Sequence, residues 1–252
     1  LSVILINFSN FDFPMNYSII SYRDIYYLFF FIFLINFIYN RSNTSVYLIS
    51  FISFLTPLLH IDTGIYLNSL FLLLVIYLII IKEFGNLFKL LSSYIVCWFT
   101  LFILVGQYEF LSFLNHLIYM AQHVDLVHGL QYPQPIFDLV QKHGFRATKG
   151  LLLQLLALII VTREIFFKNK RSPQDKIFLI FLIFMSFIAY KNALGRSDAQ
   201  HIRMSSDFSL IIIIFFSVES FLKFLQKKDS RLQLSKYLNL SILAILILLI
   251  FK

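Results

Sequence analysis

The sequence predicts an all-α protein, a polytopic bundle of about eight transmembrane helices. Of its 252 residues, 59% are apolar and only 13% carry a charge, whereas soluble domains are about half apolar and about a quarter charged. The apolar residues stand in long runs rather than alternating with polar ones, which argues against a β-barrel. Because hydrocarbon offers no water to backbone N–H and C=O groups, helices remain as the way to cross a membrane.

Apolar runs that approach the length of a membrane crossing, about 20 residues, occur along the whole chain. The predicted spans are Ile25–Tyr39, Val46–Leu59, Ile65–Ile81, Leu90–Val105, Leu151–Thr162, Ile177–Leu194, Phe208–Leu225 and Tyr237–Phe251. Two of them, Val46–Leu59 and Leu151–Thr162, are short, and we expect their helices to extend beyond these apolar cores. Pro57 lies inside one span, where a neighbouring group can satisfy the carbonyl that proline leaves free.

The chain is expected to form a single integral-membrane domain over residues 1–252. Leu1–Ile6 is apolar but too short to span, and it lacks the basic start and cleavage site of a signal peptide. We interpret residues 1–7 as the end of a preceding helix, and the chain as the C-terminal part of a longer protein. Residues 106–150 are predicted to be one long extracytoplasmic loop, within which Phe110–Ala121 is apolar enough to form a helix in the membrane interface.

Loop charges predict the orientation of the helices. If the loop after the first span faces the cytoplasm, the net charge of +8 falls on the cytoplasmic side, as the positive-inside rule requires. The cytoplasmic basic residues are then Arg41, Lys82, Lys89, Arg163, Lys168, Lys170, Arg171, Lys176, Lys223, Lys227, Lys228, Arg231 and Lys236. The opposite side is neutral and holds all six histidines, which are His60, His116, His123, His128, His143 and His201. The basic excess therefore indicates topology rather than a nucleic-acid partner, and the chemistry is predicted on the extracytoplasmic side.

A polar connector, residues 196–206, joins two predicted spans on the extracytoplasmic side. Arg196 and Arg203 are seven residues apart and would share one face of a helix. A guanidinium binds phosphate through two hydrogen bonds, which suits a lipid-linked phosphate at the interface. Asp198 and His201 are candidates for proton transfer. The alternative is an ordinary connector whose arginines pair with neighbouring aspartates.

His60 and Asp62 occupy a link so short that both residues must lie near the membrane surface. Asp62 is a candidate to bind an acceptor hydroxyl or to pair with Arg196. Alternatively, Asp62 caps the N-terminus of the following helix, a position that aspartate favours. The two roles are compatible, because a carboxylate at a helix N-terminus can also belong to a site.

The predicted long loop combines histidines, carboxylates and aromatic residues. His128 and Tyr132 are candidates for contact with a sugar. The His-x-Asp-x-x-His spacing matches no metal motif with a fixed mechanism, so we expect no metal or other cofactor, with a divalent ion as the alternative. Lys142, Arg146 and Lys149 follow this loop and suit either anionic headgroups or a substrate phosphate.

Three short stretches support a resemblance to a known class. They are Asp62-Thr-Gly-Ile-Tyr-Leu-Asn68 at the start of a helix, His128-Gly-Leu-Gln-Tyr-Pro133 in the long loop, and Gly195-Arg-Ser-Asp-Ala-Gln-His201 in the connector. With the overall helical plan, they resemble the multi-spanning glycosyltransferases that use polyprenyl-phosphate sugars, the GT-C class, and less closely the O-antigen polymerases and ligases. None of the three stretches is diagnostic by itself.

The resemblance implies a multi-pass glycosyltransferase of the cell envelope, in the bacterial inner (cytoplasmic) membrane and surrounded by membrane lipids. Its donor would be a polyprenyl-phosphate-linked sugar, and its acceptor a glycan or a lipid. The implied site residues are Asp62, Asp198 and His201 for catalysis, and Arg196, Arg203, His60, His128 and Tyr132 for binding phosphate and substrate. In this class the catalytic carboxylate lies in the first outer loop, which we expect upstream of residue 1.

The alternative function is that of a non-catalytic membrane protein, a transporter or flippase. Coupled carriers place ionisable groups near the middle of the membrane, often on broken helices. The predicted spans contain few charged residues, among them Glu219 and Lys223 toward one cytoplasmic end. This distribution argues against an ion-coupled carrier.

Overall fold

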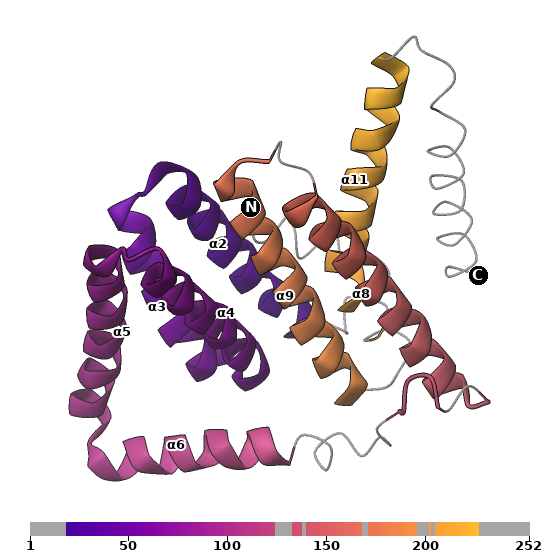
Figure 1. Ribbon diagram of the computed structural model, residues 1–252. Coiled ribbons are helices and arrows are strands. Elements are labelled where there is room, and N and C mark those ends of the chain that lie inside the picture. The colour runs from indigo at the N-terminus through magenta and orange to yellow at the C-terminus, as the bar shows by residue number, and fades with distance from the viewer. Residues whose placement is uncertain are drawn as a thin grey trace. The chain divides into compact units, whose positions relative to one another are not determined.

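The protein is helical throughout its described part (Figure 1). The computed structural model describes residues 19–123, 133–137, 140–167, 171–195, 202 and 205–226, with the backbone alone for residues 19–24, 62, 120–121, 143 and 220–226. The helices are α2 (Ile19–Asn40), α3 (Asn43–Leu59), α4 (Ile61–Ile80), α5 (Phe84–Val105), α6 (Gln107–Gln122), α8 (Lys142–Phe166), α9 (Pro173–Gly195) and α11 (Asp207–Gln226). The predicted all-α fold class is confirmed.

Each predicted span up to Phe208–Leu225 lies within one of these longer helices, except that Ile81 is one residue past the end of α4. The last predicted span, Tyr237–Phe251, lies outside the described residues. The two short spans lengthen as expected, because α3 begins at Asn43 and α8 runs from Lys142 to Phe166. Within the described residues, four stretches are long and apolar enough to cross a membrane, namely Thr63–Ile80, Phe84–Val105, Gly144–Phe166 and Pro173–Gly195. Ile25–Asn40 and Asn43–Leu59 are shorter apolar helices. These helices support a membrane-embedded protein.

The chain divides into two compact units that share helix α9. Unit 1 comprises Leu1–Gly129 with Pro173–Phe181, and unit 2 comprises Leu130–Ser172 with Leu182–Lys252. Each unit is described by itself.

In unit 1, helix α3 packs against α2, α4 and α5. The large side chains of Phe30 and Phe37 on α2 and of Leu67 on α4 are completely buried. Ser50 of α3 is also buried, and its hydroxyl donates a hydrogen bond to the carbonyl of Leu90 on α5, at 2.8 Å. Apolar packing and the hydrogen bond between Ser50 and Leu90 therefore stabilise this unit.

Pro57 interrupts the hydrogen-bond ladder of α3, because proline has no N–H to donate to the carbonyl four residues earlier. That carbonyl belongs to Ser53. The side-chain amide of Asn68, two turns into α4, donates to it at 2.9 Å and also donates to the carbonyl of Gly64 at 2.8 Å. Tyr94 of α5 completes the network by donating to the Asn68 side-chain oxygen at 2.6 Å. The expected repair by a neighbouring group is confirmed, and Asn68 provides it.

The turn between α3 and α4 is a single residue, His60, in an extended conformation with φ −148° and ψ 108°. The two helices approach so closely here that Gly64 lies against Pro57. A Cβ atom added at Gly64 would stand 2.4 Å from the Pro57 Cα and 2.5 Å from its backbone nitrogen. Only glycine fits at this position without a shift of the backbone.

The polar residues that the charge pattern assigns to the cytoplasm gather at one end of unit 1. The contacts there join Arg41 to Glu83 at 3.1 Å, Lys89 to Asn43 at 2.8 Å, and Tyr39 to Asp175. They connect the C-terminal ends of α2 and α4 with the N-terminal ends of α3, α5 and α9. Helices that alternate in direction bring these ends together, as the predicted topology requires.

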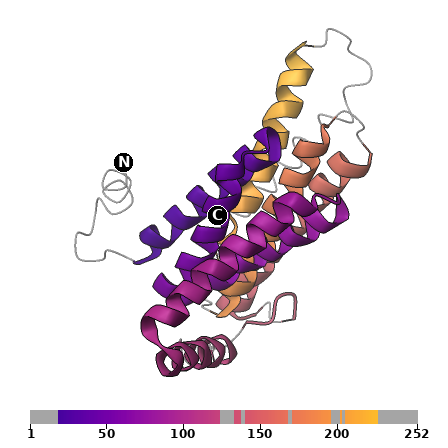
Figure 2. The ribbon, with the colours of Figure 1, turned by 90° about the vertical axis from the view of Figure 1, so that its left-hand side faces the viewer.

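Helix α6 turns sharply away from the direction of α5 (Figures 1 and 2). The turn occurs at Gly106, whose φ of +83° belongs to a region that glycine adopts without strain. The ring of Trp98 packs against those of Phe110 and Phe113, with centroids 6.0 and 6.3 Å apart, and fixes α6 on the end of α5. Residues 107–122 and 142–150, which were predicted to belong to one long loop, are helical. The helix expected over Phe110–Ala121 lies within α6.

In unit 2, α8 and α11 pack against each other and run in the same direction. Gln154, midway along α8, meets Ser209 in the first turn of α11. Farther along both helices, Glu164 and Glu219 bind Arg171. The outer part of α9 runs antiparallel to α8, because Tyr190 near the end of α9 bonds to the start of α8. The connector and the Arg171 cluster thus lie at opposite ends of this unit.

Replacing Gly64 by alanine tests the close contact between α3 and α4. The added methyl group would press on Pro57 backbone atoms, which cannot rotate away, so we expect a loss of about 1–3 kcal/mol in the free energy of unfolding. Gly85→Ala is the matched control, because a Cβ there meets nothing within 4 Å and alanine is the better helix former by up to about 1 kcal/mol. Unfolding in mixed micelles, followed by circular dichroism, measures both; equal stability of the two variants would contradict the packing.

Candidate functional site

The described part of the chain contains two of the eight predicted site residues. His60 is described with its side chain, and Asp62 by its backbone alone. Arg196, Asp198, His201, Arg203, His128 and Tyr132 lie outside the described residues. The description of the site therefore rests on His60, on the backbone of Asp62, and on described residues close in sequence to the other six, such as Ile202.

His60 and Asp62 lie at the end of unit 1 where α3 turns into α4. His60 is partly exposed, and its ring centroid is 6.3 Å from that of Tyr26 on α2. The N-cap position of α4 is occupied by His60, whose side chain makes no capping hydrogen bond. The alternative in which Asp62 is the cap is wrong, since the single-residue turn makes His60 the flanking residue. Asp62 lies inside the first turn, where a carboxylate still interacts favourably with the helix dipole.

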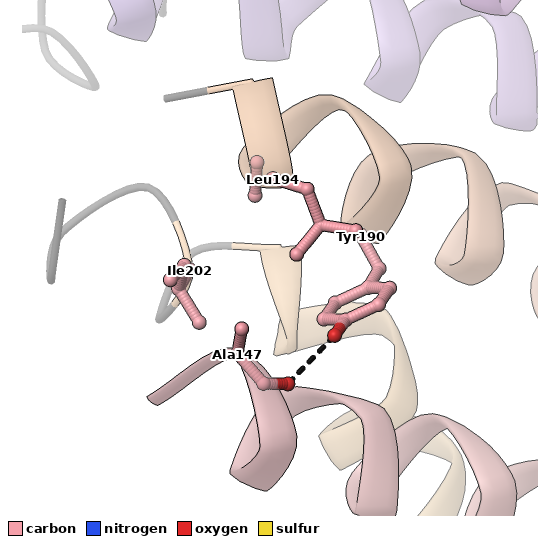
Figure 3. Packing of buried hydrophobic residues seen from close by; sticks show 5 residues of the cluster. Ala147, Tyr190, Leu194 and Ile202 are labelled. Atoms are coloured by element: carbon pink, nitrogen blue, oxygen red, sulfur yellow. Dashed lines mark hydrogen bonds between the residues drawn. The ribbon is translucent and has the colours of Figure 1, made fainter. Parts of the chain in front are cut away.

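The connector is anchored to unit 2 by Ile202, which is 4% exposed. Its side chain joins a small apolar cluster with Ala147 of α8 and with Tyr190 and Leu194 of α9 (Figure 3). The Tyr190 hydroxyl donates a hydrogen bond of 2.6 Å to the Ala147 carbonyl, shown as the dashed line in Figure 3. This bond satisfies the one polar atom that the tyrosine ring carries into the cluster.

Gly150 makes this cluster possible. A Cβ atom at Gly150 would lie 2.8 Å from the Tyr190 ring and 3.4 Å from a methyl carbon of Ile202. The absence of a side chain lets the ring rest on α8 and lets the connector approach the helix. The chain therefore passes the start of α8 closely at Ile202, between His201 and Arg203 in the sequence.

The end of the connector is fixed by hydroxyl groups. Ser205 and Ser206 are both buried, and both donate to the carbonyl of Ile202, at 2.7 and 3.1 Å. The side-chain amide of Gln154 reaches the Ser205 carbonyl at 3.4 Å. Helix α11 then begins at Asp207. The sequence around Arg203 is thus attached on one side to a buried residue and on the other to a helix start.

A buried polar cluster lies beneath the connector and was not predicted from the sequence. Gln154 of α8, Ser186 of α9 and Ser209 of α11 are all completely buried. Both serine hydroxyls lie within hydrogen-bonding distance of the Gln154 side-chain oxygen and of each other. Hydrogen-bonded polar side chains between apolar helices fix their relative position. The available signal was a lone glutamine in an otherwise apolar run, Leu151–Leu156.

An ionic cluster occupies the opposite end of unit 2. Arg171 binds Glu164, at 3.4 Å, and Glu219, and its guanidinium carbon lies 5.2 Å from the centre of the Phe216 ring. Burial lowers the pKa of Arg171, but the hydrogen bond and charge of Glu219, with a smaller contribution from Glu164, raise it above its usual value overall. Arg171 therefore stays charged and ties the α8–α9 turn to α11, a structural role rather than a catalytic one.

Among the described residues, no group of three or more His, Cys, Asp or Glu side chains could hold a metal ion.

Comparisons with protein-family models, with curated proteins and with solved structures found no match. The described residues of the connector, Ile202, Ser205 and Ser206, are held at the helical end of unit 2. Such an end can present charged side chains to a ligand at the membrane surface while the helices below stay apolar.

The serines of α11 offer a matched test of the buried cluster. Ser209→Ala removes a hydroxyl bonded to Gln154, and we expect a loss of roughly 0.5–1.5 kcal/mol in the free energy of unfolding. The Ser217 hydroxyl is buried on the same helix and has no hydrogen-bond partner among the described residues, so Ser217→Ala should be neutral or stabilising. Unfolding in mixed micelles compares the two, and a larger loss for Ser217→Ala than for Ser209→Ala would refute the role of the cluster.

Proposed function

We propose that the protein is a membrane-embedded glycosyltransferase of the cell envelope, which takes its sugar from a lipid-linked donor at the extracytoplasmic face. The observation that carries the proposal is the anchoring of the connector: Ile202 is buried between α8 and α9, and Ser205 and Ser206 bind its carbonyl. A connector that served only to join two helices would not need this many fixed contacts. Its neighbours Arg196 and Arg203 supply the cations that a lipid phosphate requires.

The reaction follows from these groups. A base removes the proton from an acceptor hydroxyl, the hydroxyl oxygen attacks the anomeric carbon, and the bond from that carbon to the phosphate oxygen breaks. Arg196 and Arg203 stabilise the negative charge that grows on the leaving phosphate. Asp198 and His201 accept or relay the proton. The acceptor is a glycan or a lipid, with His128 and Tyr132 in contact with sugar.

Asp62 and His60 are proposed to bind the acceptor. Asp62 lies in the first turn of α4, and His60 lies at the exposed turn before it. The helix dipole favours a negative charge at this position, and a carboxylate accepts hydrogen bonds from sugar hydroxyls. The hydrogen bonds of Asn68 with Ser53 and Tyr94 join α3, α4 and α5 within two turns of this site and stabilise the turn between α3 and α4.

A coupled transporter is less well supported by the described residues. Among the described residues of unit 2, Arg171 forms ion pairs with Glu164 and Glu219 at one end of the helices. The buried polar groups farther along, Gln154 and Ser209, have no charge to move. Carriers that couple to ions need ionisable groups near the middle of the membrane.

Arg196→Ala is the direct test of the proposed phosphate contact. Loss of one donor to a developing negative charge should lower the rate of sugar transfer on the order of a hundredfold, with normal membrane insertion. Transfer of a labelled sugar from polyprenyl-phosphate donors by the purified full-length protein measures this rate. Arg163→Ala is the control, since Arg163 is an exposed arginine in the last turn of α8, at the end of that helix opposite Ala147 and Gly150. Full activity in Arg196→Ala would remove the arginine from the mechanism, and a wild-type protein without transfer would refute the function.

A further inference from the structure

Three cations gather on one face of the first two turns of α8, in unit 2. Lys142, Arg146 and Lys149 are spaced by four and three residues, so they are neighbours on the helix surface. Lys142 is exposed, and the other two are partly exposed. The Lys149 ammonium lies 4.6 Å from the centre of the Phe145 ring, which holds its stem along the helix.

These cations stand where a helix least tolerates them. The N-terminal end of a helix carries a partial positive charge, so a positive side chain there is unfavourable. The first turn of α8 contains no acidic residue, and the side chain of its N-cap, Gln141, makes no capping hydrogen bond. Within the described part of the chain, no carboxylate forms a salt bridge with any of the three. An external anion would relieve both the mutual repulsion and the clash with the dipole.

Exposed apolar side chains precede the cations closely in the sequence. Phe137 is 87% exposed and Val140 is fully exposed, just before Lys142 in the chain. The short segment that carries Phe137 is held on α8, because the Ile136 N–H donates to the Thr148 hydroxyl oxygen at 2.8 Å. Ile136 has a φ of 74°, an unusual value for a β-branched residue that this hydrogen bond helps to maintain. Bulky apolar groups next to cations are typical of a surface that meets lipid headgroups and chains together.

We propose that this surface, made of Lys142, Arg146 and Lys149 with Phe137 and Val140, binds an anionic lipid by its phosphate. The three cations neutralise the phosphate, and the two apolar side chains contact the hydrocarbon next to it. A free phosphate ion would use the cations but leave Phe137 and Val140 in water, so a lipid fits the whole surface better. The same α8 turns contact Ile202 through Ala147 and Gly150, so the bound lipid lies at the end of unit 2 that carries the connector.

Lipid binding can be measured without any sugar transfer. A protein that binds the lipid but transfers no sugar would contradict the proposed enzyme activity and leave the lipid site in place. The purified full chain is titrated in detergent with phosphatidylglycerol, phosphatidylcholine, polyprenyl phosphate or inorganic phosphate, and bound molecules are counted by native mass spectrometry. The test variant is Lys142→Gln/Arg146→Gln/Lys149→Gln. The control, Lys82→Gln/Arg163→Gln/Lys176→Gln, removes the same charge elsewhere.

We expect the wild type to bind phosphatidylglycerol more tightly than phosphatidylcholine, and the test variant to lose this affinity on the order of a hundredfold, at about 1 kcal/mol for each cation. The control should change little. Phe137→Gln/Val140→Gln should weaken lipid binding without removing a charge. Polyprenyl phosphate that binds more tightly than phosphatidylglycerol would identify the donor lipid as the ligand, and equal binding would identify anionic headgroups in general.

Three results would overturn the inference. The first is unchanged lipid binding by the test variant, and the second is an equal loss in the test and control variants, which would mean that only total charge matters. The third is displacement of the lipid by an equal concentration of inorganic phosphate, which would show that the apolar side chains contribute nothing. Circular dichroism of each variant confirms that a loss of binding is not a loss of folding.

Discussion

Hydrocarbon provides no hydrogen bonds, and this constraint governs where polar groups stand in the protein. Each buried donor or acceptor needs a partner within the chain, because one left without a partner costs several kcal/mol in lipid, by order of magnitude. Helices satisfy the backbone, and side chains repair the exceptions. Asn68 supplies the N–H that Pro57 cannot give to the Ser53 carbonyl. Gln154 meets the same need for Ser186 and Ser209, where three helices cross in unit 2.

The same constraint moves chargeable groups to the ends of the helices, and the two ends of unit 2 serve different purposes. At one end Arg171 neutralises two carboxylates and ties a turn to α11. At the other, Ile202 and Tyr190 anchor a polar connector without neutralising the cations of α8. The ionic cluster of Arg171 stabilises the fold, whereas the three cations of α8 form no salt bridge with a carboxylate of the described residues and can bind a ligand. This difference is why the proposed chemistry belongs to the connector end.

Composition and the length of the apolar runs were enough to predict the helices, because membrane thickness sets a strong lower limit on a span. The contacts between helices could not be predicted from the sequence. An apolar run has no polar side that tells one face of the helix from another, so nothing in Leu151–Thr162 indicated which helices Gln154 would join. The cap at His60 was missed because a one-residue turn depends on the close fit of Gly64 against Pro57. Spacing placed Arg196 and Asp198 in one connector, but their side-chain geometry depends on contacts that no local pattern encodes.

The central claim is that the chemistry of the protein is confined to one side of the membrane, opposite its basic loops. Single cysteines in a Cys97→Ala background test this claim, with Gln134→Cys reporting on the predicted outer side and Lys82→Cys on the cytoplasmic side; both residues are exposed. A membrane-impermeant maleimide should label Gln134→Cys in intact cells and Lys82→Cys only after permeabilisation. Labelling of both cysteines in intact cells, or of Lys82→Cys alone, would contradict the account.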